Sequence, residues 1–478
     1  MALIIVLCAL LGSALAWFPP GYSAPWPQPN NTLCQQAYTP DDADLSGLTT
    51  YADGDGWIRL VEIDDRCDHG DELGAFGIDC DVVDAESGMK VLTFAAAVYT
   101  LSQQVWLPPS TVIQGQADPN VAGDPRRRPS LKRHTVFTPG DWSCAPTQRT
   151  SWARFPMYNS HMKCLRKGFL MNTNTALRNF LAQGSAEDGQ GIGMGLSGGG
   201  LIELPGCGTA YASDAGCGGP DEQYDDVPDL SFPNRTFWTG FDGGTAVHNV
   251  LVENLRLNDL RADSSASSNV GFWSSMTTDG SAHTNVTLRK VVSMQTNQDG
   301  VNVHGSVKGW KASDLHFENT GDDVYAVWGA GADTKTSGMA SGRCPHLTNA
   351  PATDVSFERV FARQQPGGGY GTCMSIFGAR RVTVDRILCC EEKDDGDLQG
   401  MFNLEKDFCS AYPRGETAIT VTHAQWFRGG HDLCRGGYTQ FQNDVGGSLH
   451  GNSLSGGDCD DLCSTGCTWI NGTQPGQE

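Results

Sequence analysis

The sequence predicts an all-β protein in which a single parallel β-helix, a solenoid of stacked coils, carries long loop insertions. An apolar template recurs along the chain, and no long amphipathic helix or regular hairpin signal interrupts it. The 59 glycines follow no collagen period and so indicate many tight turns. The length of 478 residues would allow two or three ordinary domains, but repeat folds often run longer as one unit.

The template is apolar-x-apolar-x-x-apolar-x-apolar. Within each half the period is two, as in a strand with one buried face, and the extra residue between the halves restores inward pointing after a bend. The first positions lie 36, 24, 45, 27 and 37 residues apart, which leaves loops of varied length, and such loops usually build a cleft. The six copies begin at Val250, Val286, Trp310, Val355, Val382 and Ile419.

The N-terminus predicts export. Residues 3–15 are apolar and Ala14-Leu-Ala16 offers a small-x-small cleavage site, so we expect residues 1–16 to be a signal peptide, although no Lys or Arg precedes the apolar run. No later segment approaches 18 uninterrupted apolar residues. We therefore expect a secreted, extracellular protein. Of its 17 cysteines Cys8 leaves with the signal, and the other 16 can form eight disulfides. N-glycosylation sequons begin at Asn30, Asn234, Asn285 and Asn471.

The rest of the chain divides into three predicted parts. Residues 17–85 form an N-terminal extension or cap, residues 86–450 form the β-helix catalytic domain, and residues 451–478 form a Cys-rich tail. Strand-like runs over 89–101 and 105–115 open the β-helix, and residues 180–240 are a large loop insertion. We expect Cys459, Cys463 and Cys467 to tie the tail by disulfides, because zinc binding is less favoured in an oxidising compartment.

The formal charge of −22 bears on the choice of partner. It argues against nucleic acid or an anionic membrane surface, because no counterion release would favour binding. It also disfavours a strongly acidic polymer as substrate, unless a local basic groove overrides the net charge. We expect a monomer.

Two template copies set a register for the candidate site. Val286 and Trp310 are 24 residues apart, and this offset stacks Asp299 on Asp323 about 4.8 Å away, the usual spacing of neighbouring strands. Asp322 joins them, so three carboxylates meet on one part of the surface. A fold that gathers like charges is more often using them than tolerating them. The same offset pairs Val301 with Tyr325, Val303 with Val327 and His304 with Trp328.

Alternation along the strands predicts which side chains face the core. Val301, Val303, Tyr325 and Val327 point inward, whereas Asn302, His304, Trp328 and Asp322 point outward. Asp299 and Asp323 share the inward parity, where an ionised carboxylate would be very costly. They must therefore lie in the turn before each strand, where Gly300 and Gly321 allow tight backbone bends.

Three gathered carboxylates suit the hydrolysis of a glycosidic bond. One carboxylic acid protonates the leaving oxygen and another carboxylate activates water, and packing them together raises the pKa of at least one. We assign Asp322 as general acid, with Asp299 and Asp323 holding and deprotonating the water. The alternative is a Ca²⁺ site or a hydrated Asp-rich turn.

Four further residues are candidates for substrate binding. Trp328 can stack on a sugar ring, and His304 and Asn302 can bond sugar hydroxyls, although a plain surface histidine is the more common case. Arg380 lies near the next coil and can border the cleft. We expect no cofactor and no catalytic metal. The segment from Tyr51 to Glu62 mimics a calcium loop at Asp53, Asp55, Gly56, Ile58 and Glu62, so structural Ca²⁺ is an alternative there.

These motifs resemble one glycosidase family. Gln298-Asp-Gly-Val-Asn-Val-His-Gly305, Asn319-Thr-Gly-Asp-Asp-Val-Tyr-Ala-Val-Trp328 and Met374-Ser-Ile-Phe-Gly-Ala-Arg-Arg-Val-Thr-Val384 resemble glycoside hydrolase family 87, the mycodextranases and α-1,3-glucanases. The resemblance covers about residues 245–430. It implies a right-handed parallel β-helix, inverting hydrolysis, and Asp299, Asp322 and Asp323 as catalytic residues. A weaker resemblance is to the polygalacturonase family, from which the chain departs in having no Gly-His-Gly before Ser375 and no clear Arg-x-Lys.

Three functions therefore compete. The first is a secreted glycosidase that cleaves a neutral α-glucan, within the chain and at α-1,3 bonds. The second is a hydrolase or lyase acting on a uronate polysaccharide, although no Lys or Arg lies within the two Asp motifs to abstract a proton or grip a carboxylate. The third is a non-catalytic β-helix that binds carbohydrate.

Overall fold

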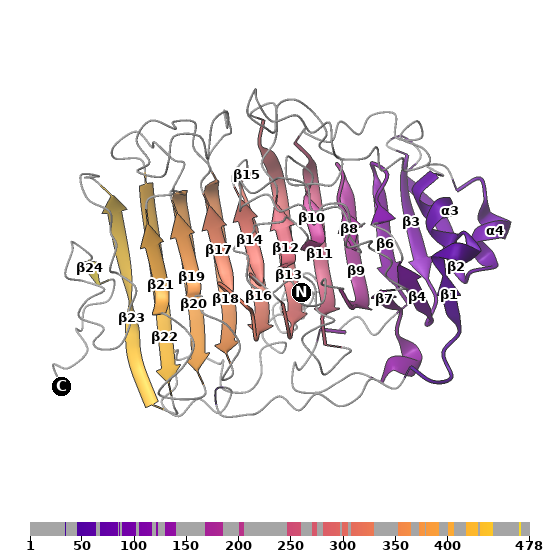
Figure 1. Cartoon of the computed structure of the whole chain (residues 1–478). Helices are drawn as coiled ribbons and strands as arrows, with labels where there is room; N and C mark the ends of the chain where they lie inside the picture. Colours follow the sequence, from indigo (N-terminus) through magenta and orange to yellow (C-terminus); the bar gives the residue numbers. More distant parts are fainter. Residues whose placement is uncertain are drawn as a thin grey trace, which may run out of the picture.

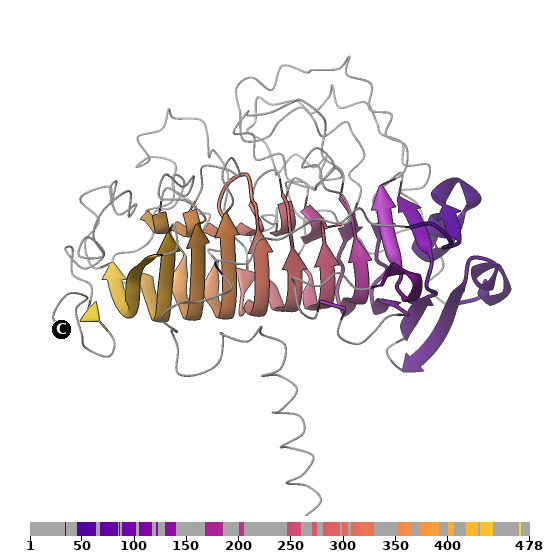
Figure 2. The same cartoon turned by 90° about the horizontal axis from the view of Figure 1, so that it is seen from below.

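The computed structural model describes residues 34, 45–63, 67–84, 86, 88–101, 105–116, 121–122, 130–139, 168–184, 200–204, 246–259, 270–274, 281–296, 299–304, 307–328, 352–364, 372–377, 379–391, 400–405, 417–428, 431–442 and 468–469. These residues are nearly all β, and their strands stand side by side in an elongated stack (Figure 1). The described helices lie at the end of the stack that is drawn in indigo and purple (Figure 2). They are η1 (Asp53–Asp55), α3 (Trp57–Ile63), α4 (Gly70–Gly74) and η2 (Leu131–Arg133).

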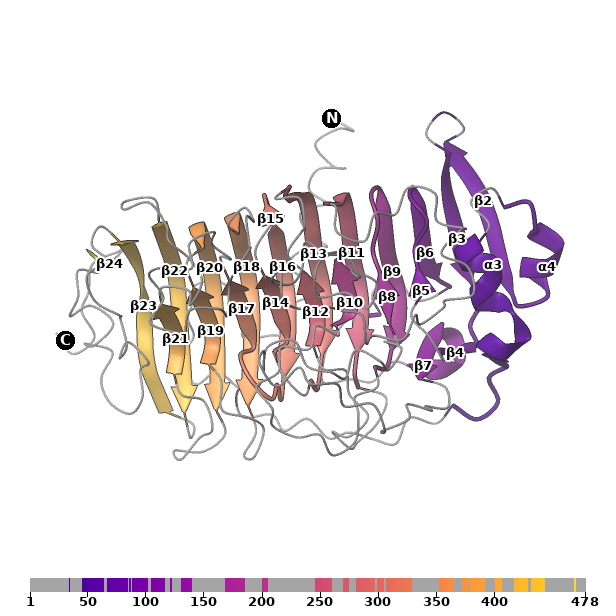
Figure 3. The same ribbon diagram turned by 45° about the horizontal axis from the view of Figure 1, so that its top comes forward.

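The described strands form two sheets that face each other (Figure 3). The larger has sixteen strands: β1 (Thr50–Ala52), β2 (Ile78–Asp84), β3 (Met89–Phe94), β4 (Val98–Leu101), β6 (Thr111–Gly115), β7 (Val136–Pro139), β9 (Thr175–Ala182), β11 (His248–Leu257), β13 (His283–Ser293), β15 (Val307–Lys308), β16 (Lys311–Glu318), β18 (Thr353–Gln364), β20 (Arg380–Glu391), β22 (Thr417–Arg428), β23 (His431–Gln442) and β24 (Thr468–Trp469). The smaller has eight: β5 (Val105–Trp106), β8 (Phe169–Leu170), β10 (Gly200–Leu204), β12 (Val270–Ser274), β14 (Val301–His304), β17 (Tyr325–Trp328), β19 (Thr372–Phe377) and β21 (Gly400–Glu405).

From β8 to β22 the chain alternates between the sheets, except that β15 and β16 follow each other in the large sheet, and each strand pairs in parallel with its counterpart in the next coil. The predicted template register is confirmed. Val250 pairs with Val286, Leu288 with Ala312, and the same alignment continues through Val355, Val382 and Ile419. The first positions Val286 and Trp310 are fully buried. Burial of such an apolar column on every coil is the main term that stabilises the stack.

The extra residue adopts a left-handed backbone conformation in five of the six template copies, and Asn179 of β9 does the same. Their φ lies between 53° and 64° in six successive strands of the large sheet, which bends the strand and returns the next side chain to the core. Neighbouring coils are tied at this column: Arg359 grips Asp314 through Nε–Oδ1 and Nη2–Oδ2 distances of 2.6 and 3.0 Å. The six bend residues are Asn179, Asn254, Lys290, Asp314, Arg359 and Arg386.

One hydrophobic core runs from Trp57 to Val421. The N-terminal segment is part of it, because β1 pairs with β4 and the Trp57 side chain packs edge-on against Phe94 and Tyr99. At the other end the prediction of parallel strands up to residue 450 is wrong. Strand β23 pairs antiparallel with β22 and with β24, which covers the open edge of the last parallel strand.

Three disulfides lie among the described residues. Cys67 is bonded to Cys80, Cys373 to Cys389 and Cys34 to Cys390. The bond from Cys373 crosses the core from β19 to β20, and the bond from Cys34 ties the N-terminal extension to β20. The described residues include no helix long and apolar enough to cross a membrane. The predicted signal peptide, the cysteines of the tail and the sequons at Asn30, Asn234 and Asn471 lie outside the described residues.

Candidate active site

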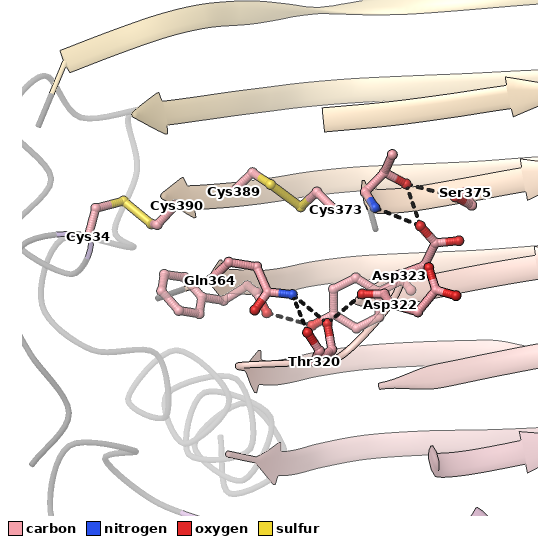
Figure 4. Close-up of a disulfide and its surroundings, with 12 residues drawn as sticks. Cys34, Thr320, Asp322, Asp323, Gln364, Cys373, Ser375, Cys389 and Cys390 are labelled. Carbon is pink, nitrogen blue, oxygen red and sulfur yellow. Dashed lines mark hydrogen bonds between the residues drawn. A yellow bond between two sulfur atoms is a disulfide. The ribbon is translucent and has the colours of Figure 1, made fainter. Parts of the chain in front are cut away.

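Three carboxylates meet where the chain passes from the large sheet to the small one. Asp299 lies just before β14, and Asp322 and Asp323 lie just before β17. One oxygen of each carboxylate lies within 4.8 Å of the others. Figure 4 shows Asp322 and Asp323 side by side at the start of the small-sheet strands. The turn location predicted for Asp299 and Asp323 is confirmed.

Backbone pairing brings the two turns together. The Gly300 N–H donates to the Asp323 carbonyl at 3.0 Å, and the Gly321 N–H donates to the Thr296 carbonyl at 2.9 Å. Beyond the turns, β14 pairs with β17 in the predicted register, with Val301 opposite Tyr325. The predicted inward residues Val301, Val303, Tyr325 and Val327 all belong to the core. The 24-residue offset therefore predicted correctly the register of β14 and β17 and the pairing of the two turns.

The three carboxylates differ in exposure. Asp299 and Asp323 are buried, whereas Asp322 is exposed. Burial raises the pKa of Asp299 well above its usual range, and the charges of Asp322 and Asp323 raise it further. Loss of solvation and the charge of Asp323 raise the pKa of Asp322 to about 7. Burial also raises the pKa of Asp323, but hydrogen bonds from Ser375 and Thr372 oppose that rise.

Thr372 holds the carboxylate of Asp323. The Thr372 N–H and hydroxyl lie 2.6 and 2.8 Å from Asp323 Oδ1, and the Thr372 hydroxyl lies 2.7 Å from the Ser375 hydroxyl. All three residues are buried. Sequence reasoning missed Thr372 and Ser375, because they are 49 and 52 positions beyond Asp323 and carry no acidic or basic group. The strand register could have predicted that Ser375 lies near the carboxylates, because Ser375 pairs with Ala326, three residues after Asp323.

Asn302 has a different role from the one predicted. We expected an outward side chain that meets the substrate, but Asn302 is fully buried and its Nδ2 donates to Oδ2 of Asp299. The non-core face of β14 is therefore covered at this position, so alternation alone could not give its exposure. Asn302 contacts the carboxylate cluster directly and fixes the Asp299 side chain.

The turn that carries Asp322 is also hydrogen-bonded. The Thr320 hydroxyl donates to the Asp322 carbonyl at 2.8 Å. Gln364, at the end of β18, donates from Nε2 to the Thr320 carbonyl and hydroxyl at 2.8 and 2.7 Å (Figure 4). Thr320, together with Gln364 of the next coil, thus fixes the backbone that carries Asp322.

The other predicted binding residues are less defined. His304 and Trp328 are paired on β14 and β17, and their side chains lie outside the part that the structure describes. Arg380 is half-buried at the start of β20, after the end of β19, whereas the carboxylates precede the small-sheet strands. A whole strand therefore separates Arg380 from the carboxylates, and the structure does not bring them together.

Two alternatives concern cations. The carboxylate oxygens of Asp299, Asp322 and Asp323 lie within 4.8 Å of one another, which is close enough for one cation to bridge them. Ca²⁺ binding therefore stays an alternative to catalysis at this cluster. In the predicted calcium loop, Asp53 and Asp55 lie in η1, the Asp55 carboxylate accepts the Ala52 N–H at 3.0 Å, and Ile58 is buried in α3. The Glu62 side chain lies outside the described residues, so that prediction stays open.

Comparison with known proteins gives distant similarities. No family model matches the chain, and no curated protein matches it. The chain is similar to the catalytic unit of a thermostable GH87 α-1,3-glucanase from Streptomyces thermodiastaticus strain HF3-3, with 12% identity over 83% of this chain and 51% of that one and a TM-score of 0.31. It is also similar to the enzymatically active domain of bacteriophage CBA120 tailspike protein 2, with 10% identity over 68% of this chain and 43% of that one and a TM-score of 0.23. Similarities of this strength establish neither a family nor an activity for the chain.

Proposed function

We propose that the chain is a glycoside hydrolase whose catalytic groups are Asp299, Asp322 and Asp323. The observation that carries the proposal is the gathering of three carboxylates with unequal exposure in one turn region. Two of them are buried with raised pKa values, and the third has a pKa near 7. Groups of this kind exchange protons at neutral pH, as hydrolysis of a glycosidic bond requires.

In this mechanism Asp322 is the general acid. A pKa of about 7 keeps part of the Asp322 population protonated at neutral pH, and its exposure lets it reach a leaving oxygen. Asp323 and Asp299 hold a water molecule, and one of them removes its proton as the water attacks the anomeric carbon. Proton transfer by a positioned carboxyl group typically contributes about 10²–10⁴-fold to the rate.

The proposed substrate is a neutral α-glucan cleaved within the chain at α-1,3 bonds. The substrate class follows from the net charge of −22 and from the missing Arg-x-Lys, which leave no group to grip uronate carboxylates in the recognised motifs. The linkage follows only from the motif resemblance to family 87. The same resemblance supports a single right-handed parallel β-helix, in keeping with the alternation between two parallel sheets. The three disulfides support work in an oxidising, extracellular compartment.

The inverting course also rests on the resemblance. Inverting enzymes usually separate their two carboxyl groups by about 6.5–9.5 Å and retaining enzymes by about 5–5.5 Å. The oxygens here lie within 4.8 Å, so their spacing does not favour inversion. The anomeric configuration of the first product, followed by NMR before mutarotation, decides between the two courses.

A substrate panel tests the function. The enzyme is incubated with α-1,3-, mixed α-1,3/1,4- and α-1,6-glucans and with polygalacturonate, and reducing ends, product size and ultraviolet absorbance are measured. We expect reducing ends from an α-glucan without new absorbance. Equal or better activity on polygalacturonate would favour the uronate alternative, new absorbance would identify a lyase, and binding without products would identify a carbohydrate-binding β-helix.

A further inference from the structure

The start of β19 supplies the hydrogen-bond donors of Asp323. Thr372 offers two groups to one oxygen, Asp323 Oδ1: its backbone N–H at 2.6 Å and its hydroxyl at 2.8 Å. A threonine hydroxyl has one hydrogen. If that hydrogen goes to Asp323, the Ser375 hydroxyl is the donor in the 2.7 Å contact between the two hydroxyls. The two side chains then form one chain of donors that ends on the carboxylate.

From this arrangement we propose that Thr372 and Ser375 are positioning residues that hold Asp323 as the ionised base. The inference rests on the proposed function, and it resolves which buried carboxylate deprotonates the water. A carboxylate that accepts several donors is favoured in its charged form. The neighbouring acid Asp299 accepts a side-chain amide, from Asn302, in place of the two hydroxyls.

The electrostatics of the two buried acids agree with this division. The pKa of Asp299 is raised well above its usual range by burial and then by the charges of Asp322 and Asp323, and hydrogen bonds from the Asn302 side chain and the Asp323 backbone only partly oppose that rise. The pKa of Asp323 is raised by burial alone, and donors from Ser375 and Thr372 lower it. Among the His, Cys, Asp and Glu residues that the structure describes, those gathered with Asp323 are Asp299 and Asp322. Of the two buried acids, Asp323 is therefore the one that gives up its proton first.

Both hydroxyl donors are buried and fixed in place. Thr372 and Ser375 are 1% and 0% exposed, so water does not compete for their hydroxyls. Thr372 is also fixed along the chain, because the next residue, Cys373, is bonded to Cys389 across the core. The donors are therefore in place before substrate arrives, which is the condition for electrostatic preorganisation.

The test compares two substitutions at one position. Thr372→Val keeps the shape and the backbone N–H but removes the hydroxyl, whereas Thr372→Ser keeps the hydroxyl. We expect Thr372→Val to lower kcat roughly 10- to 100-fold, the loss typical of one hydrogen bond to a charged group, with KM unchanged. The acid limb of its pH–rate profile should move to higher pH. Thr372→Ser should stay near the parent, and Ser375→Ala should shift the profile in the same direction by less.

Three controls separate the outcomes. Melting temperatures identify a variant that loses activity through unfolding, and in that case Ser375→Ala carries the test. Equal kcat losses in Thr372→Val and Thr372→Ser, or an unmoved pH profile in the folded variants, would overturn the positioning role. If Asp323→Asn is inactive while Thr372→Val behaves like the parent, only this inference fails. If Asp323→Asn itself keeps near-normal activity, the proposed function fails.

Discussion

Gly300 and Asp323 are joined by a backbone hydrogen bond of 3.0 Å, from the Gly300 N–H to the Asp323 carbonyl. This bond holds the turn of Asp299 beside the turn of Asp323 in the next coil. The approach is close enough to exclude a side chain. A Cβ on Gly300 would lie 2.6 Å from the Val324 carbonyl oxygen and 2.6 Å from Phe317 Cδ1.

Gly300→Ala should therefore separate the two turns. The backbone oxygen cannot yield as a flexible side-chain tip can, so we expect a destabilisation of roughly 1–3 kcal/mol, as for an overpacked core, with a steep loss of kcat. Melting temperature and glucanase activity measure the two effects. Gly54→Ala is the matched control, because nothing lies within 4 Å of its Cβ position. Unchanged activity in a folded Gly300→Ala variant would contradict the close fit.

The three aspartates should respond differently to a change of leaving group. Asp322→Asn should fold normally and lower kcat steeply, because an amide cannot donate the proton. Asp299→Asn and Asp323→Asn should lose activity and keep substrate binding. An α-glycosyl fluoride needs no protonation, so it should restore turnover to Asp322→Asn and not to the other two. If all three folded variants keep near-normal activity on the polymer, the cluster is structural.

Calcium binding at the carboxylates predicts another result. A bridging cation would stabilise the folded chain by mass action, so EDTA would lower the melting temperature and added Ca²⁺ would restore it. The glycosidase proposal predicts no such change through these residues. Asp299→Asn is the control, because a calcium effect that survives this substitution arises elsewhere, for instance at the loop of Asp53 and Asp55.

Stability should fall as pH rises from about 4 to 7. The unfolded pKa of an aspartate is about 3.9, and that of Asp322 in the fold is about 7. Between these values the folded state keeps a proton that the unfolded state has released, so this contribution is full below pH 4 and is lost through pH 7. Asp322→Asn removes the titration. The melting temperature of Asp322→Asn minus that of the parent should increase from pH 4 to pH 7 and stay constant above pH 7. A difference that is the same at every pH would contradict the raised pKa of Asp322.

The bend residue Asn254 should matter for stability alone. Its φ is 54°, its Oδ1 accepts the Ala122 N–H at 3.0 Å and its Nδ2 donates to Asn179 at 2.8 Å. Asn254→Ala should cost about 2–4 kcal/mol, from left-handed strain and two lost hydrogen bonds. Asn254→Gly keeps the backbone conformation and should lose less. Denaturant unfolding measures both, and equal losses would show that the backbone conformation contributes little.

The sequence predicted what is periodic and missed what is not. The template fixed the register of Val250, Val286 and Val382, because burial of an apolar column is decided locally on each coil. The same offset placed Asp299 beside Asp323. Thr372 was beyond prediction, since it lies 49 positions beyond Asp323 and outside the period of the template. Asn302 was misjudged because alternation gives the face of a side chain and does not say what covers that face.

The disulfide between Cys34 and Cys390 has a consequence for biosynthesis. Its two cysteines are 356 residues apart, so the ribosome must complete most of the stack before Cys34 meets its partner. Until then the partner of Cys34 does not exist, and any earlier pairing with another cysteine would have to be exchanged for the native bond. The bond also packs with Ala122, with Phe361 of the neighbouring strand β18 and with Leu388 of β20 itself. Its closure therefore requires that β20 has been made and that Cys34 lies against it, and a chain halted before residue 390 would lack the partner of Cys34.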